Sequence, residues 1–191
     1  MSNLKSNKNI VGIDIDCVLT ELKPTMEHMA NYFGKPVASF DKITDYNLSE
    51  VYDVSENKTL EFWMVEEKYL CETAVPATNR IQKIYDTFVD EETTVVIVTS
   101  RHKKYTDVTA KWLEDNGIKH DMLILTSGSC KKPIIEHFEF DYMIDDKPDL
   151  FYAMEESDTT MVCVDYEYNK DVPTTLRMSR DGDIYYGPWS E

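Results

Sequence analysis

The sequence predicts an α/β protein in which helices cover both faces of a parallel β-sheet and a small helical cap is inserted after the first strand. Short apolar segments alternate with amphipathic ones, which is typical of a parallel sheet covered by helices. Polar residues follow these apolar segments, and in such sheets ligands bind at the carboxyl ends of the strands. The first two apolar segments, 9–16 and 93–98, are much farther apart than a strand–helix–strand crossover requires, so we expect an insertion between them.

Five segments are predicted to be strands. The first, 9–16, is apolar and β-branched until it meets the carboxylates of Asp14 and Asp16. The other four are 93–98, 122–125, 140–144 and 160–164. Helical spacing of apolar residues predicts helices at 80–90 and 106–116, the second followed by Gly117 as a C-terminal cap.

The insertion is also predicted to be helical. One helix is expected at 24–33, closed by Gly34, and a second at 58–70. We therefore predict a core made of residues 1–19 and 86–191, and a cap of residues 20–85 over the strand ends.

Charge and composition limit the class of partner. The chain has 36 acidic and 20 basic side chains and a formal net charge of −16, which argues against binding a nucleic-acid polymer. A small anion could still bind where a divalent cation and local basic groups reverse the field. Neither a membrane-spanning run nor a signal peptide is recognisable, so we expect a cytoplasmic protein that does not bind membranes. The sequence does not decide whether the protein forms a homodimer.

Acidic and hydroxyl side chains follow several of the predicted strands in a recurring order. Asp14 and Asp16 end the first strand, and a carboxylate pair of this kind is by itself more typical of a turn or a helix cap. Farther along come Thr99 and Ser100, then two adjacent lysines, then Asp145 and Asp146. Carboxylates without histidine or cysteine suit Mg²⁺, which prefers hard oxygen ligands.

In this order the motifs resemble those of the haloacid dehalogenase (HAD) superfamily, over nearly the whole chain. Within that superfamily the chain is most similar to the 5′(3′)-deoxyribonucleotidases and to small bacterial proteins described as nucleotidases. The runs that carry this similarity are 98–101 and 144–149 in the core, and 43–46 and 61–63 in the cap. The resemblance implies a Rossmann-like core and phosphate chemistry, since the dehalogenase branch lacks an aspartate at the position of Asp16.

The resemblance implies separate roles for the first two aspartates. Asp14 would be the nucleophile and would form an aspartyl-phosphate, because a carboxylate needs no deprotonation at neutral pH. Asp16 would be the general acid and base. Asp14, Asp146 and the backbone carbonyl of Asp16 would bind Mg²⁺, with Asp145 in a supporting role.

The phosphate-binding residues implied by the resemblance are Thr99, Ser100 and one of the two lysines. Lys131 lies ten residues before Asp141, a spacing expected for the small bacterial nucleotidases, whereas Lys132 precedes Pro133 as in many other members of the superfamily. We favour Lys131, and the alternative is that both are surface lysines.

Four further residues are candidates for contact with substrate. Arg101 follows the second strand, but a surface arginine would have the same sequence pattern. Tyr46, Phe62 and Trp63 could stack on a base, although aromatic residues at helical spacing more often pack in a core.

These observations predict a Mg²⁺-dependent phosphomonoester hydrolase, a 5′(3′)-(deoxy)nucleotidase that acts through an aspartyl-phosphate. Two alternatives remain at this point. One is a phosphatase of another small phosphomonoester, such as a sugar or cofactor phosphate, and the other is a non-catalytic binding protein with the same fold. Intact Asp14, Asp16 and Asp146 argue against the second.

Overall fold

A seven-stranded sheet forms the centre of the computed structural model, which describes residues 9–187. The strand order is β3-β2-β1-β4-β5-β6-β7, and all neighbours are parallel except β6 and β7. The strands are β1 (Ile10–Ile13), β2 (Thr94–Thr99), β3 (Met122–Leu125), β4 (Tyr142–Asp145), β5 (Thr160–Val164), β6 (Leu176–Met178) and β7 (Ile184–Tyr186). The predicted α/β class and parallel sheet are therefore confirmed.

Six α-helices connect the strands within the described residues. They are α1 (Leu22–Phe33), α2 (Glu56–Thr73), α3 (Thr78–Phe88), α4 (Thr106–Asp115), α5 (Lys132–His137) and α6 (Pro148–Ala153). Three short 3-10 turns are η1 (Phe40–Lys42), η2 (Lys103–Tyr105) and η3 (Glu167–Asn169). Gly34 and Gly117 have φ angles of 64° and 66°, the left-handed conformation that ends α1 and α4 as the sequence predicts.

The two faces of the sheet pack against different helices. Residues of β2 alternate between them: Val95 and Ile97 join the cluster that contains Ile84 of α3 and Leu113 of α4. On the other face, neighbouring strand residues join the cluster that contains Ile135 of α5. The core therefore has helices on both faces of the sheet, α3 and α4 on one and α5 and α6 on the other.

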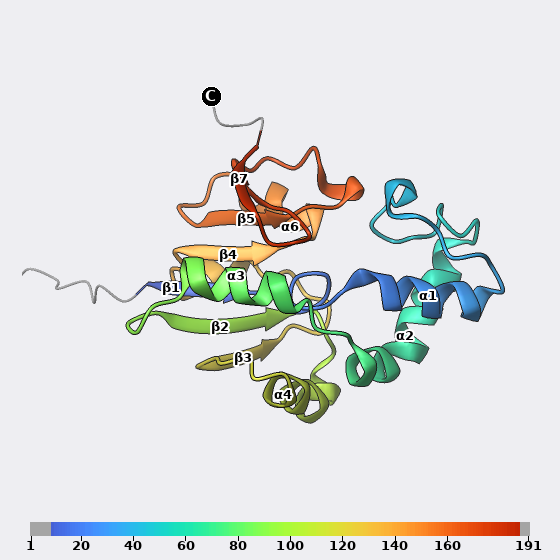
Figure 1. Cartoon of the computed structure of the whole chain (residues 1–191), viewed down its shortest axis with the longest axis horizontal. Coiled ribbons are helices and arrows are strands. Elements are labelled where there is room, and N and C mark those ends of the chain that lie inside the picture. Colours follow the sequence, from blue (N-terminus) through green and yellow to red (C-terminus); the bar gives the residue numbers. More distant parts are fainter. Residues whose placement is uncertain (1–8, 188–191) are drawn as a thin grey trace, which may run out of the picture.

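The helical insertion lies beyond the carboxyl ends of the parallel strands. Figure 1 shows α1 and α2 past the arrowheads of β1, β2 and β4, while α3 returns across the sheet. The two chain segments that join the insertion to the sheet pair with each other, since Glu21 N donates to Val75 O at 2.8 Å and Ala77 N donates to Leu19 O at 2.9 Å. A cap at 20–85 remains a proposal, and α3 continues past its end to Phe88.

The hairpin formed by β6 and β7 was not predicted from the sequence. Each strand has only three residues, Leu-Arg-Met in β6 and Ile-Tyr-Tyr in β7, so neither forms the apolar run that marks the inner strands. Within residues 9–187, no helix has both the length and the apolar character needed to cross a bilayer.

Candidate active site

The centre of the site is a buried lysine between two carboxylates. Lys131 Nζ lies 2.7 Å from Asp14 Oδ1 as an ion pair and donates a hydrogen bond to Asp145 Oδ2 at 2.7 Å. Asp14 follows β1 and Asp145 ends β4, and these strands are neighbours in parallel register. Asp14 N donates to Ile144 O at 3.0 Å, which extends the pairing and holds the two aspartates at one edge of the sheet.

The structure distinguishes the two candidate lysines. Lys131 is only 4% exposed and lies just before α5, where its side chain enters the carboxylate pair. Lys132 Nζ instead donates to Ala153 O at 2.8 Å and lies 3.5 Å from Glu136. Lys131 is therefore the lysine that lies in the candidate site.

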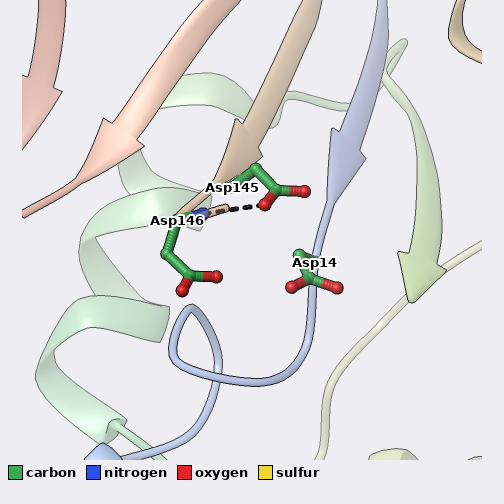
Figure 2. Close-up of side chains that lie close together, drawn as sticks. All are labelled: Asp14, Asp145 and Asp146. Carbon is green, nitrogen blue, oxygen red and sulfur yellow. Dashed lines mark hydrogen bonds between the residues drawn. The ribbon is translucent and has the colours of Figure 1, made fainter. Parts of the chain in front are cut away.

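Three carboxylates form a group that could hold a metal ion. Asp14, Asp145 and Asp146 offer oxygen atoms within 4.8 Å of one another, and all three residues are buried. Figure 2 shows their carboxylates around the space between the ends of β1 and β4. Asp145 Oδ1 already accepts the backbone N–H groups of Asp146 at 2.9 Å and Lys147 at 2.8 Å. Backbone hydrogen bonds thus occupy much of the Asp145 carboxylate, so Asp14 and Asp146 are better placed to bind a metal ion.

The charge balance of this group also fits a cation. Burial raises the pKa of the Asp14 carboxyl to about 7, although the Lys131 ammonium opposes the shift. Burial and the neighbouring carboxylates raise the pKa of Asp146 well above its ordinary range. Burial disfavours the charged form of Lys131, but its ion pairs outweigh this and raise its pKa. One buried ammonium faces three buried carboxylates, so a divalent cation with hard oxygen preference would complete the neutralisation.

Asp16 lies outside this group and is paired with Arg101. Arg101 Nε donates to Asp16 Oδ2 at 3.0 Å, and Arg101 Nη2 donates to Asp16 Oδ1 at 2.8 Å. Between Asp16 and the rest of the loop, Cys17 has a φ of 64°, and its N–H donates to Thr20 Oγ1 at 3.0 Å. Asp16 is therefore not one of the three grouped carboxylates, and metal binding by its backbone carbonyl stays a prediction.

The two hydroxyl residues after β2 have different surroundings. Thr99 is completely buried, and its Oγ1 accepts the N–H of Arg101 at 3.3 Å. Ser100 is half-buried, and its carbonyl accepts the N–H of Gly128 at 2.9 Å. Thr99 thus supports the turn that carries Arg101, while a phosphate contact by either hydroxyl remains a prediction.

The three aromatic candidates of the cap lie in different environments. Tyr46 approaches the sheet edge, with its ring 5.4 Å from that of Tyr168 and with Lys147 Nζ 5.8 Å from its centre. Phe62 is 0% exposed and packs against other aromatic rings of the cap, among them Trp63 at 5.3 Å. Phe62 therefore packs in the core of the cap, and Trp63 is half-buried beside it. Of the three aromatic candidates, Tyr46 lies nearest the carboxylates.

Two residues that contact the site were not singled out from the sequence. Tyr168 donates its hydroxyl hydrogen to Asp146 Oδ2 at 2.5 Å. Asn169 Nδ2 donates to the carbonyls of Asp146 and Val164, each at 2.8 Å. Both belong to η3, which follows β5. Their position directly after a predicted strand was the only sequence signal for these two residues. That position brings them to the site because β5 lies beside β4 in the sheet.

Comparison with known proteins agrees with this geometry. The family model described as 5′ nucleotidase, deoxy (pyrimidine), cytosolic type C protein matches residues 8–186. "Putative nucleotidase YqfW" of Bacillus subtilis is 23% identical over 136 residues, covering 71% of this chain and 69% of the relative. "Putative nucleotidase OB0422" of Oceanobacillus iheyensis is 22% identical over 180 residues, covering 87% and 92%.

Solved structures show the same fold at low sequence identity. A HAD-superfamily hydrolase, subfamily IA, from Geobacter sulfurreducens has a TM-score of 0.56 and 12% identity, covering 95% of this chain and 97% of that one. A haloacid dehalogenase-like hydrolase from Streptococcus pneumoniae has a TM-score of 0.53 and 12% identity, covering 83% and 85%. The chain thus has the fold of HAD-superfamily hydrolases. Since the family model spans nearly the whole chain, this protein belongs to the 5′ nucleotidase, deoxy (pyrimidine), cytosolic type C family, whose members are phosphoric monoester hydrolases.

Proposed function

We propose that this protein is a Mg²⁺-dependent nucleotidase that hydrolyses (deoxy)nucleoside monophosphates through a phosphoryl group carried on Asp14. The observation that best supports this chemistry is the position of Lys131, whose ammonium touches both Asp14 and Asp145. A nucleophilic carboxylate must meet a phosphate dianion, and the fixed positive charge beside Asp14 lowers their mutual repulsion. The nucleotide substrate is inferred from family membership.

The donor set of the proposed site suits Mg²⁺. Asp14 and Asp146 would supply carboxylate oxygens, and Asp145 would hold the loop through the backbone N–H groups it accepts. When bound, Mg²⁺ would neutralise charge on the phosphoryl oxygens during transfer. The hydrogen bond from Tyr168 would keep the Asp146 carboxylate in a fixed orientation.

The first step transfers the phosphoryl group to the protein. An Asp14 carboxylate oxygen forms a bond to phosphorus while the ester P–O bond breaks. Asp16, in its protonated form, gives its proton to the departing oxygen, so a neutral nucleoside leaves. Lys131 remains beside the charge that develops on the phosphoryl oxygens.

The second step releases phosphate. The Asp16 carboxylate takes a proton from a water molecule, and the water oxygen bonds to phosphorus as the bond to Asp14 breaks. Inorganic phosphate leaves, Asp14 is again a carboxylate and Asp16 is again protonated. Each proton that Asp16 gives in the first step is thus recovered in the second.

The experiment that tests this proposal is mass spectrometry of protein quenched in acid during turnover. With Mg²⁺ and a panel of nucleoside monophosphates, we expect one phosphoryl adduct on the peptide that contains Asp14. Asp14→Asn removes the attacking oxygen with little change in volume, so turnover should fall about 10⁴-fold or more and the adduct should be absent. Turnover by Asp14→Asn near that of the unmodified protein would show that the mechanism is wrong.

A further inference from the structure

The guanidinium of Arg101 is directed at Asp16. Its Nε and Nη2 atoms donate to the two carboxylate oxygens of Asp16 at 3.0 and 2.8 Å, an arrangement that fixes both the position and the plane of the carboxylate. The Arg101 side chain is 3% exposed, whereas that of Asp16 is 54% exposed. A buried guanidinium therefore holds an exposed carboxylate.

Arg101 is itself held on several sides. Its N–H donates to Thr99 Oγ1 at 3.3 Å, and its carbonyl accepts the N–H of Ser127 at 3.1 Å. Its guanidinium carbon lies 5.7 Å from the centre of the Trp112 ring. The remaining Nη1 atom is buried and has no hydrogen-bond partner within residues 9–187. Asp16 thus occupies the edge of the guanidinium formed by Nε and Nη2.

The segment that carries Arg101 also contacts the end of the helical insertion. His102 N donates to Glu67 Oε1 of α2 at 2.6 Å. Trp112 Nε1 donates to Ala74 O, directly after α2, at 2.8 Å. These bonds keep the arginine in a fixed place relative to both the sheet and the insertion.

We propose that Arg101 is a positioning residue that orients Asp16 for proton transfer. This inference rests on the proposed function, because it assigns Arg101 to the acid–base residue of that reaction. Arg101 exchanges no proton in either step. It restricts the rotamers of an otherwise exposed carboxyl group, and such restriction matters because proton transfer requires hydrogen-bond reach and alignment.

The test uses aryl phosphates that differ mainly in the acidity of the departing phenol: phenyl, 4-nitrophenyl and 2,4-dinitrophenyl phosphate. A poor leaving group needs a proton from Asp16, whereas dinitrophenolate leaves without one. For Arg101→Gln we expect kcat/KM to fall about 10²-fold with phenyl phosphate and less than about 3-fold with 2,4-dinitrophenyl phosphate. Arg101→Lys is measured in parallel, in case the glutamine variant does not fold.

Equal losses with all three esters would overturn the proposal, because a phosphate-binding or purely structural arginine would affect them alike. Arg177→Gln is the matched control: Arg177 is also buried and donates from Nε to Asp165 at 2.7 Å, away from Asp16. It should leave the ratio between the esters unchanged, whatever it does to stability.

A second measurement separates this proposal from the proposed function. In an Asp16→Asn background, Arg101→Gln should lower phenyl phosphate turnover less than about 3-fold further, because two residues that act as a unit are not additive. A full additional loss would overturn the proposal for Arg101. Failure of the nucleotidase mechanism itself would instead be seen as persistent activity in Asp14→Asn.

Discussion

The carboxyl edge of the sheet and the helical insertion beyond it place their side chains in different ways. At the sheet edge, Asp14 follows β1 and Asp145 ends the adjacent parallel strand β4, so backbone register brings the two carboxylates together beside Lys131. In the insertion, α1 and α2 pack through aromatic residues, and Phe62 lies at the centre of that packing with no exposed surface.

Burial of a side chain therefore has opposite effects on the free energy of folding in the two regions. Burying carboxylates and a lysine at the sheet edge costs free energy because charged groups lose hydration, and ion pairs offset only part of this cost. Buried charged groups of this kind are typical of functional sites. A buried phenylalanine in the insertion is favourable and needs no further explanation. We therefore expect the catalytic residues at the sheet edge, and the residues that select the substrate in the exposed part of the insertion.

The largest effect should come from removing the divalent cation, because it would break the sheet-edge chemistry and leave the insertion intact. Protein treated with a chelator should lose essentially all turnover and recover it with Mg²⁺. Added Mg²⁺ should also stabilise the fold by about 2.7 kcal/mol at a hundred times its dissociation constant, measured by thermal unfolding. In Asp146→Asn this stabilisation should be largely lost, and undiminished turnover without metal would contradict the proposed site.

The next effect concerns stability rather than chemistry. Phe62→Ala should lower the free energy of unfolding by about 3–5 kcal/mol, because it leaves a cavity among aromatic rings. Leu60→Ala on the same helix is the control, since Leu60 is 57% exposed and should change stability by less than about 0.5 kcal/mol. Chemical denaturation measures both, and a stable Phe62→Ala protein with altered substrate choice would reverse our assignment.

Much of the sheet could be predicted because its strands are short apolar runs with polar residues after them. The segments 122–125 and 160–164 match β3 and β5, and the four predicted helices lie within a few residues of α1 to α4. The short helices α5 and α6 were not predicted. The hairpin β6–β7 was missed because its three-residue strands carry Arg177, Tyr185 and other side chains that hydropathy does not distinguish from a loop.

Prediction of the site from the sequence had a similar limit. Motif order singled out Asp14, Asp145, Asp146 and one of two lysines, with Lys131 favoured, and the structure brings Lys131 together with the three aspartates. It could not reveal Tyr168, because the contact with Asp146 depends on β5 lying beside β4 and on how η3 turns back. Sequence also left open whether Arg101 was a surface residue, since its burial depends on Trp112 and on α2, both distant along the chain.

A smaller effect should follow from removing the hydroxyl of Tyr168. Tyr168→Phe keeps the ring but loses the hydrogen bond to Asp146, so the Mg²⁺ concentration for half-maximal activity should rise about 10-fold. Tyr166→Phe is a close control, because Tyr166 stacks on Tyr168 at 5.2 Å but donates to Cys17 O instead. An equal change in both variants would indicate a general disturbance of this turn rather than orientation of a metal ligand.

The smallest effect tests the insertion where it approaches the sheet edge. Tyr46 is 39% exposed, its ring lies edge-on to Tyr168, and Lys147 lies over its face. If the exposed ring contacts the base, Tyr46→Ala should lower kcat/KM for a nucleoside monophosphate about 3–10-fold and leave phenyl phosphate nearly unchanged, since an aromatic contact is worth about 0.5–1.5 kcal/mol. Tyr46→Phe retains the ring and should preserve most of the nucleotide activity. Steady-state kinetics on both substrates measure this selectivity. Equal losses on the two esters would mean that Tyr46 supports the carboxylate group through Tyr168, and the contact with the base would then have to come from another residue of the insertion.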